Sequence, residues 1–152
     1  MKTRKIEAFK IIGISVRTTN ENNQAAKDIP ALWQKFMSEG LLNAIPNKVD
    51  NDIYCLYTHY EKDHTKPYTT LLGCKVKTLD NIPEGMVGYE FEGGNYINLP
   101  AKGDLMNGAV YNKWLEIWGM NLNRAFTADF EIYGSKSQNP NDAEVDILIS
   151  LK

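Results

Sequence analysis

The chain of 152 residues has little of what several protein classes require, beginning with its two cysteines, Cys55 and Cys74. Two cysteines without C-x-x-C spacing are too few for a disulfide scaffold or a zinc site, so we expect a reducing, cytoplasmic location. No apolar run approaches the roughly 18 residues of a membrane span, and the N-terminus has no signal-peptide cleavage site. Lys and Arg number 17 against 19 Asp and Glu. With no basic excess, we expect neither membrane insertion nor direct nucleic-acid binding.

Motifs of common enzyme classes are missing as well. None of the serines, Ser135 and Ser150 included, lies in a nucleophile elbow. Gly93 and Gly94 lack a following G-x-G-x-x-G or G-K-[ST] pattern, so they predict a turn and not a nucleotide-binding loop. We therefore assign no catalytic residues, no metal ligands and no cofactor, and we favour a protein that is not an enzyme.

What the sequence does contain is the composition of a globular protein. Hydrophobic residues make up 43% and charged residues 24%, with 8 Tyr, 5 Phe and 3 Trp. A chain of this length typically buries about 68 to 70% of its unfolded surface, which is enough for a substantial core. We predict a single domain over residues 1–152.

The first part of the chain changes from a β pattern to a helical pattern. Residues 5–18 are rich in β-branched and aromatic side chains and predict a strand, in which Gly13 marks a bend or a bulge. A helix is predicted next, with Pro30 in its first turn, apolar residues at helical spacing over 32–37, and an end at Gly40.

A hairpin follows this helix. The segments DIYCLYTHYE and YTTLLGCKVKT predict its two strands, on either side of the polar connection KDHTKP. If the hairpin is symmetric about Asp63 and His64, Cys55 lies opposite Cys74, where we expect a reduced and partly buried pair.

The second part of the chain repeats this order. Residues 86–100 predict a strand with a turn at Gly93, and residues 104–120 predict a helix that ends near Gly119. The segments DFEIY and EVDILISL predict two more strands. The chain is thus β-α-β-β written twice, with repeats of about 1–80 and 81–152. We predict an α+β fold with an antiparallel sheet, both helices on one face, and a ligand groove between the pseudo-symmetric halves.

Aligning the third elements of the repeats locates a candidate site. Tyr54-Cys55-Leu56-Tyr57 matches Phe130-Glu131-Ile132-Tyr133 as apolar, variable, apolar, Tyr. Because side chains alternate along a strand, Asp129, Glu131 and Tyr133 share one face, and Cys55, Tyr57 and His59 occupy the equivalent face of the first repeat.

A carboxylate flanked by aromatic rings suits a cation with a flat or apolar body. The rings offer stacking and cation–π attraction, and Glu131 offers the countercharge. The simpler alternative is that Glu131 faces water or pairs with a surface Lys, since acidic residues are common on exposed sheet faces. For Trp33 and Trp114, which lie at core-like helical spacing, packing is the default explanation.

Several strings resemble the GyrI-like effector-binding domains of AraC-type regulators, and most closely the stand-alone integron-associated effector-binding proteins. These strings are IPALWQKF, IPNKVDNDIYCLYTHYEKDH, PYTTLLGCKV, LDNIPEGM and TADFEIYG. The resemblance implies a protein that binds amphipathic, cationic, aromatic compounds and takes part in multidrug sensing or transcription regulation. It implies Glu131 as the charge partner on the pocket floor, Tyr57 and Tyr133 as pocket walls, and Trp114 and Trp33 as further contacts.

The resemblance also leaves two alternatives and one difference. Some GyrI-like proteins hydrolyse cyclopropane-bearing genotoxins, with Glu131 here as the candidate base and Tyr57 or Tyr133 as the orienting group. Others bind DNA gyrase and restrain it. Unlike the regulators, this chain shows no additional helix-turn-helix domain, so we expect that regulation would need a homodimer or a partner protein, or would not occur.

Overall fold

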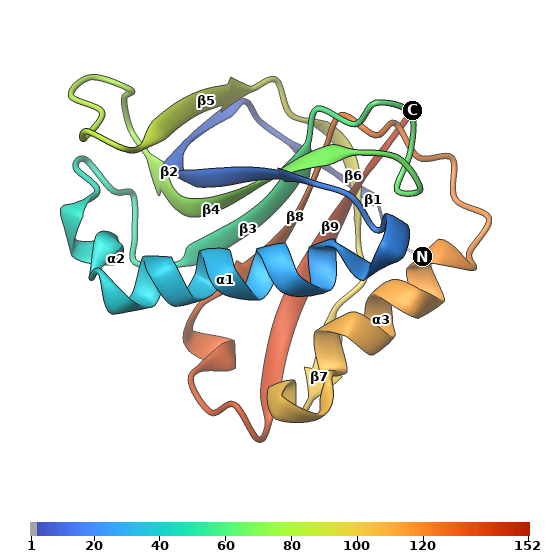
Figure 1. The fold of residues 1–152 in the computed structure, drawn as a ribbon. Helices are drawn as coiled ribbons and strands as arrows, with labels where there is room; N and C mark the ends of the chain where they lie inside the picture. Colours follow the sequence, from blue (N-terminus) through green and yellow to red (C-terminus); the bar gives the residue numbers. More distant parts are fainter. Residues whose placement is uncertain (1–2) are drawn as a thin grey trace.

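The computed structural model of the chain describes residues 3–152 and consists of one curled antiparallel sheet with its helices on one side (Figure 1). The strands are β1 (Thr3–Ile6), β2 (Phe9–Thr18), β3 (Ile53–Thr58), β4 (Tyr68–Val76), β5 (Val87–Phe91), β6 (Gly94–Asn98), β7 (Ala101–Gly103), β8 (Ala128–Tyr133) and β9 (Ala143–Leu151). The helices are α1 (Ala25–Ser38), α2 (Leu41–Ala44) and α3 (Ala109–Trp118), with 3₁₀ turns η1 (Glu21–Asn23), η2 (Leu105–Asn107) and η3 (Ser135–Ser137).

The two predicted repeats meet at the centre of the sheet. The strand order is β1-β6-β9-β8-β3-β4-β2-β5, and β7 pairs with β9. The elements β2-α1-β3-β4 and β6-α3-β8-β9 are thus the two β-α-β-β units, joined through the antiparallel pair β3–β8. This confirms the predicted α+β fold and places both long helices on the same face of the sheet, as Figure 1 shows.

The segment predicted as one continuous strand over residues 5–18 is divided in two, and the segment 86–100 is divided at the turn that was predicted at Gly93. The first break separates β1 from β2, and the second separates β5 from β6. The antiparallel register between these two segments does not shift across the breaks. Thr3 pairs with Ile97, and six residues further along the first segment Phe9 pairs with Phe91, which lies six residues earlier in the second. Each long segment bends so that one part joins each half of the sheet. The glycines indicated the bend at Gly93, whereas alternation in the sequence does not reveal the break between β1 and β2.

Gly13 serves a close approach of two backbones, and the expectation of a bulge there was wrong. β2 and β4 pair without interruption from Lys10↔Val76 to Thr18↔Tyr68, and Gly13 lies opposite Gly73. A Cβ atom on Gly13 would lie 2.0 Å from the carbonyl oxygen of Leu72. The missing side chains allow the strands to pass this closely where the sheet curls.

α1 begins earlier than predicted. It starts at Ala25, so Pro30 lies inside the helix and not in its first turn. The helix ends before Gly40, which adopts a left-handed conformation with φ 63° and leads into the short helix α2, an element that the sequence pattern did not indicate. On the second helix, the predicted end near Gly119 is confirmed.

Three clusters of apolar side chains hold the layers together. One cluster fills the curled side of the sheet with residues such as Leu56, Leu71 and Phe130. The other two lie beneath the helices: Phe36 of α1 packs over the first repeat, and Ile117 of α3 packs over the second. The sheet is therefore buried on both faces, and the space between the two helical clusters lies over the β3–β8 pair.

The hairpin β3–β4 is symmetric about Asp63 and His64, but the expected pairing of the cysteines was wrong, because Cys55 opposite Cys74 requires a centre one residue later, between His64 and Thr65. Thr58 pairs with Thr69, and in this register Cys55 lies opposite Leu72 and not opposite Cys74. Both thiols are free and buried in the cluster beneath α1. Burial raises the pKa of Cys74 to about 11, so this thiol stays protonated at neutral pH.

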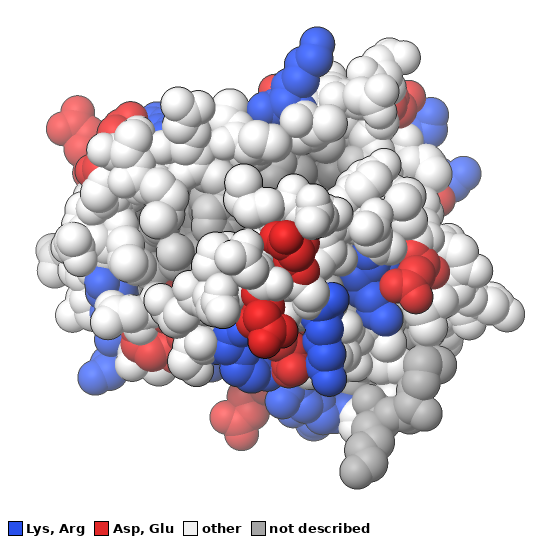
Figure 2. Space-filling model, turned by 90° about the horizontal axis from the view of Figure 1, so that it is seen from below, with Lys and Arg blue, Asp and Glu red and all other residues white. Residues whose placement is uncertain are grey.

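Charged side chains on the face shown in Figure 2 are of mixed sign, with acidic and basic groups next to one another. Ion pairs of this kind occur within the described residues: Lys136 lies 2.8 Å from Glu144 and 2.9 Å from Asp146. Within residues 3–152, no helix combines the length and apolar composition needed to cross a membrane.

Candidate ligand-binding site

The site lies on the helix-facing side of the β3–β8 pair, where the two repeats meet. Cys55 is paired with Glu131, and these are the same two residues that the repeat alignment made equivalent. The pseudo-twofold axis therefore passes between them. Tyr57 and Tyr133, which are equivalent to each other, lie two residues further along each strand, and their side chains return toward this axis.

Glu131 is buried and accepts three hydrogen bonds. The Tyr57 hydroxyl and the Trp114 indole Nε1 each donate to Oε2 at 2.7 Å, and the Tyr133 hydroxyl donates to Oε1 at 2.6 Å. Only 2% of Glu131 is exposed. Within the described part of the chain, no basic side chain forms an ion pair with this carboxylate, whereas the neighbouring Asp129 has one. The alternative that Glu131 faces water or pairs with a surface Lys is wrong.

Burial dominates the electrostatics of this group. It raises the pKa of Glu131 above the ordinary value of 4.5, and the hydrogen bonds from Tyr133, Tyr57 and Trp114 partly oppose this shift. Burial also raises the pKa of Tyr57 and of Tyr133 well above 10.0, so both hydroxyls keep their protons. The carboxylate is stabilised by neutral donors and has no countercharge of its own.

Two aromatic pairs stand on either side of Glu131. The ring of Trp33 meets Tyr133 edge-on at 4.8 Å between centroids, and Trp114 meets Tyr57 edge-on at 5.5 Å. Each pair joins a tryptophan of one repeat's helix to a tyrosine of the other repeat's strand. The duplication thus supplies two matching aromatic walls.

These groups line a cavity of about 530 Å³ between α1, α3 and the sheet. Pockets for drug-sized molecules range from roughly 300 to 1,000 Å³. The lining residues are Asn20, Asn23, Ala25, Ala26, Ile29, Pro30, Trp33, Tyr57, Tyr60, His64, Tyr68, Leu105, Gly108, Val110, Tyr111, Trp114, Trp118, Arg124, Glu131 and Tyr133. Apolar and aromatic side chains therefore enclose one uncompensated carboxylate.

The structure brings together all five side chains that the sequence singled out: Trp33, Tyr57, Trp114, Glu131 and Tyr133. His59, which was expected on the same face, is not among them. It follows the end of β3 with a φ of 51°, which breaks the alternation, and its ring packs on Tyr89 instead.

Sequence reasoning missed the wall formed by the β3–β4 connection and the end of α3. Here the imidazole of His64 stacks on Trp118 with 5.2 Å between centroids and an angle of 4°. Asn20, which follows β2, holds the β3–β4 connection in place: its side-chain nitrogen donates to the carbonyl of His64, and its side-chain oxygen accepts from the hydroxyl of Tyr68. These contacts join residues more than 40 positions apart, and no local pattern indicates them.

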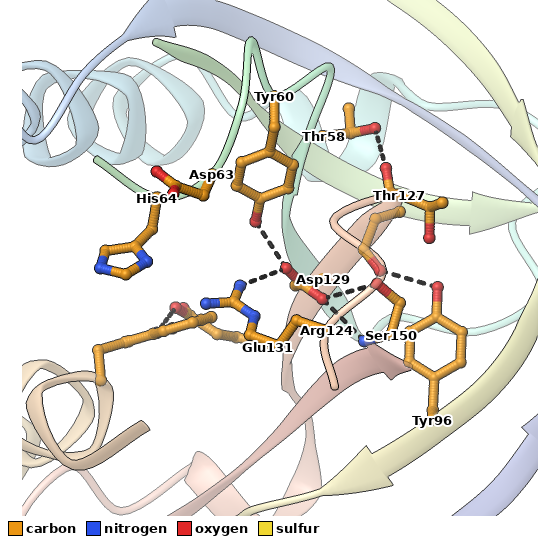
Figure 3. Close-up of polar contacts among 12 residues, drawn as sticks. Thr58, Tyr60, Asp63, His64, Tyr96, Arg124, Thr127, Asp129, Glu131 and Ser150 are labelled. Atoms are coloured by element: carbon orange, nitrogen blue, oxygen red, sulfur yellow. Dashed lines mark hydrogen bonds and ion pairs between the residues drawn. The ribbon is translucent and has the colours of Figure 1, made fainter. Parts of the chain in front are cut away.

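A second buried carboxylate, Asp129, lies two residues before Glu131 and is fully compensated (Figure 3). Its Oδ2 accepts from Arg124 Nη2 and from the Tyr60 hydroxyl, both at 2.7 Å, and its Oδ1 accepts from the Ser150 backbone N–H at 2.8 Å. Of the two acids on this strand, Asp129 has a structural role, and Glu131 is the one whose charge is left without a cation. Among residues 3–152, no group of His, Cys, Asp and Glu is arranged to hold a metal ion.

Comparison with known proteins identifies the family. The sequence model of one family, described as integron-associated effector binding protein, matches residues 4–151. The chain belongs to the integron-associated effector-binding proteins. Among solved structures, integron cassette protein VCH_CASS2, from the mobile metagenome of Vibrio cholerae, is 31% identical to this family member. Its TM-score is 0.74, with 99% of this chain and 95% of that chain covered.

Two further proteins are similar to this integron-associated effector-binding protein over nearly its whole length. The Bacillus subtilis (strain 168) protein whose name reads "Putative transcriptional regulator protein YobU" is 27% identical over 152 residues, which cover 97% of this chain and 94% of that protein. SAV2435, whose structure contains tetraphenylphosphonium, has the same fold with a TM-score of 0.81 and 17% identity, over 99% of this chain and 93% of its own.

Proposed function

We propose that this integron-associated effector-binding protein binds amphipathic cations with aromatic groups and releases them unchanged. The observation that carries the proposal is Glu131, a buried carboxylate that has no ion-pair partner among residues 3–152 and lies on the floor of an aromatic cavity. An unpaired charge is costly to bury, and a cationic ligand would offset that cost.

The walls of the cavity support the same class of ligand. Trp33 with Tyr133, and Trp114 with Tyr57, present aromatic rings on both sides of the carboxylate, which suits a positive charge carried by aryl groups. A structural neighbour with the same fold was solved with tetraphenylphosphonium, a cation of this kind.

A role in regulation is the second part of the proposal, supported by the similarity to YobU. We propose that ligand binding is communicated through a homodimer or through a separate regulatory protein, in the cytoplasm, and not by direct contact of this chain with DNA.

A titration that follows tryptophan fluorescence tests the binding proposal. Tetraphenylphosphonium and an uncharged triphenyl analogue such as triphenylmethanol are each added to the protein, and every ligand is analysed by mass spectrometry after incubation. We expect saturable quenching by the cation, weaker binding of the neutral compound, and unchanged ligand masses. A product that has gained water would indicate the hydrolase alternative, and the absence of any binding would favour the gyrase-type interaction role.

A further inference from the structure

The hydrogen bonds around Glu131 leave its carboxylate almost saturated with donors. A carboxylate offers about four lone-pair positions. Oε2 accepts from both Tyr57 and Trp114, and Oε1 accepts from Tyr133. One position on Oε1 therefore remains for a ligand.

The direction of these hydrogen bonds is fixed by their neighbours. The Cys55 thiol lies 3.3 Å from the Tyr57 oxygen and donates to it, and Tyr57 in turn donates to Glu131. The indole nitrogen of Trp114 is a donor only, so it has no other way to interact with Oε2. Turning the Tyr57 hydroxyl toward a ligand would break two contacts at once.

Other acceptors near this position are few. The Tyr133 oxygen provides a second, weaker acceptor, and the walls beside it are the rings of Trp33 and Trp114. The side-chain oxygen of Asn20, which accepts from Tyr68 and keeps one lone pair, lies elsewhere on the lining. The surroundings of the carboxylate are thus negative in charge but poor in hydrogen-bond acceptors.

On this basis we propose that the site selects cations without N–H donors, such as quaternary ammonium and phosphonium ions, over primary ammonium ions of the same shape. This inference rests on the proposed binding function. A primary ammonium has three N–H donors, and at Glu131 at least one of them would be buried without a partner. A quaternary cation has none and interacts with the aromatic faces and the negative charge alone.

The test compares two ligands that share one body: 4-phenylbutyltrimethylammonium and 4-phenylbutylammonium. Their dissociation constants are measured by calorimetry at pH 8 for the wild type and for Tyr133→Phe, which removes the weak acceptor of the Tyr133 oxygen and in exchange frees a lone pair on the charged Oε1, a stronger acceptor for an N–H donor. The three methyl groups of the quaternary ion add apolar surface, which favours its binding to either protein. The ratio of the two ligands' dissociation constants in the wild type is therefore compared with the same ratio in Tyr133→Phe, so that this contribution cancels. Tyr89→Phe, a tyrosine outside the cavity, is the matched control.

We expect the wild type to bind the quaternary ion at least tenfold more tightly than the primary ammonium ion. In Tyr133→Phe the ratio of the two dissociation constants should be smaller by about fivefold or more, and in Tyr89→Phe it should equal that of the wild type. Equal affinity of the wild type for both ions, or the same ratio in Tyr133→Phe, overturns the inference. If neither ion binds the wild type, and tetraphenylphosphonium does not bind either, it is the proposed function that fails. Should Tyr133→Phe not fold, Trp114→Phe frees a position on Oε2 and serves the same comparison.

Discussion

Replacing Glu131 by glutamine removes the charge of the site and changes its shape very little. A cation held about 5 Å from the carboxylate interacts with it by about 3 kcal/mol at an effective dielectric constant near 20. The three donors from Tyr57, Trp114 and Tyr133 already stabilise the carboxylate, which reduces the part available to a ligand. We therefore expect Glu131→Gln to weaken cation binding by about 10- to 100-fold, since 1.4 kcal/mol corresponds to a factor of ten.

The same substitution has an opposite effect on the protein without ligand. Since burial raises the pKa of Glu131, its ionised form costs stability at neutral pH. This cost decreases as the pH falls below the raised pKa and is gone below the ordinary value of 4.5, where the unfolded chain is protonated as well. Glu131→Gln should therefore unfold at the same temperature as the wild type or at a higher one. Weaker binding in an equally stable protein distinguishes the loss of a charge from the loss of the fold.

Calorimetric titration with tetraphenylphosphonium and with triphenylmethanol provides the assay, and thermal unfolding monitors stability. Glu90→Gln, at the exposed position of the edge strand β5, changes the net charge by the same amount outside the cavity and is the control. The neutral ligand should bind Glu131→Gln about as well as it binds the wild type. Equal cation affinity of Glu131→Gln and the wild type would refute the role of the carboxylate.

Three other perturbations follow from the structure. Cation affinity should fall as the pH falls through the raised pKa of Glu131, because the cation must then displace a proton from the carboxyl group. The number of protons released on binding, measured by calorimetry in two buffers, should drop to zero in Glu131→Gln. Because that variant keeps His64, the loss would assign the proton to Glu131. Gly13→Ala, which forces a Cβ against the backbone of β4, should lower stability by about 3 kcal/mol and the melting temperature by roughly 10 °C. Arg124→Met leaves Asp129 buried without its cation and should cost about 3 to 5 kcal/mol in urea unfolding; a smaller loss in the double variant with Asp129→Leu would confirm the coupling.

The parts of the fold that could be predicted are those that local periodicity determines. Apolar residues at helical spacing located α1 and α3, and strict alternation in DFEIY placed Glu131 and Tyr133 on the face opposite Phe130. The duplication extended this reasoning, because one strand predicted the orientation of its equivalent. This reasoning placed Tyr57, Glu131 and Tyr133 on one face, and the family resemblance added Trp114 and Trp33 as cavity contacts.

The parts that could not be predicted depend on contacts between distant residues. The break between β1 and β2 exists because each part pairs with a different half of the sheet. The partner of Asp129 is Arg124, which lies in a loop without any helical or strand pattern. The stacking of His64 on Trp118 joins a hairpin connection to a helix end, and it requires the complete tertiary structure.

The pseudo-symmetry of the fold also explains why the site contains one carboxylate and not two. Cys55 and Glu131 occupy equivalent positions and lie directly opposite each other across β3 and β8. Two carboxylates in such contact could not both be ionised in a buried site, and one would hold a proton. With a small thiol on one side, the tyrosine and tryptophan of each repeat can surround a single charge. The duplication thus provides two matched aromatic walls, and a single difference at its axis turns them into a site with one negative centre.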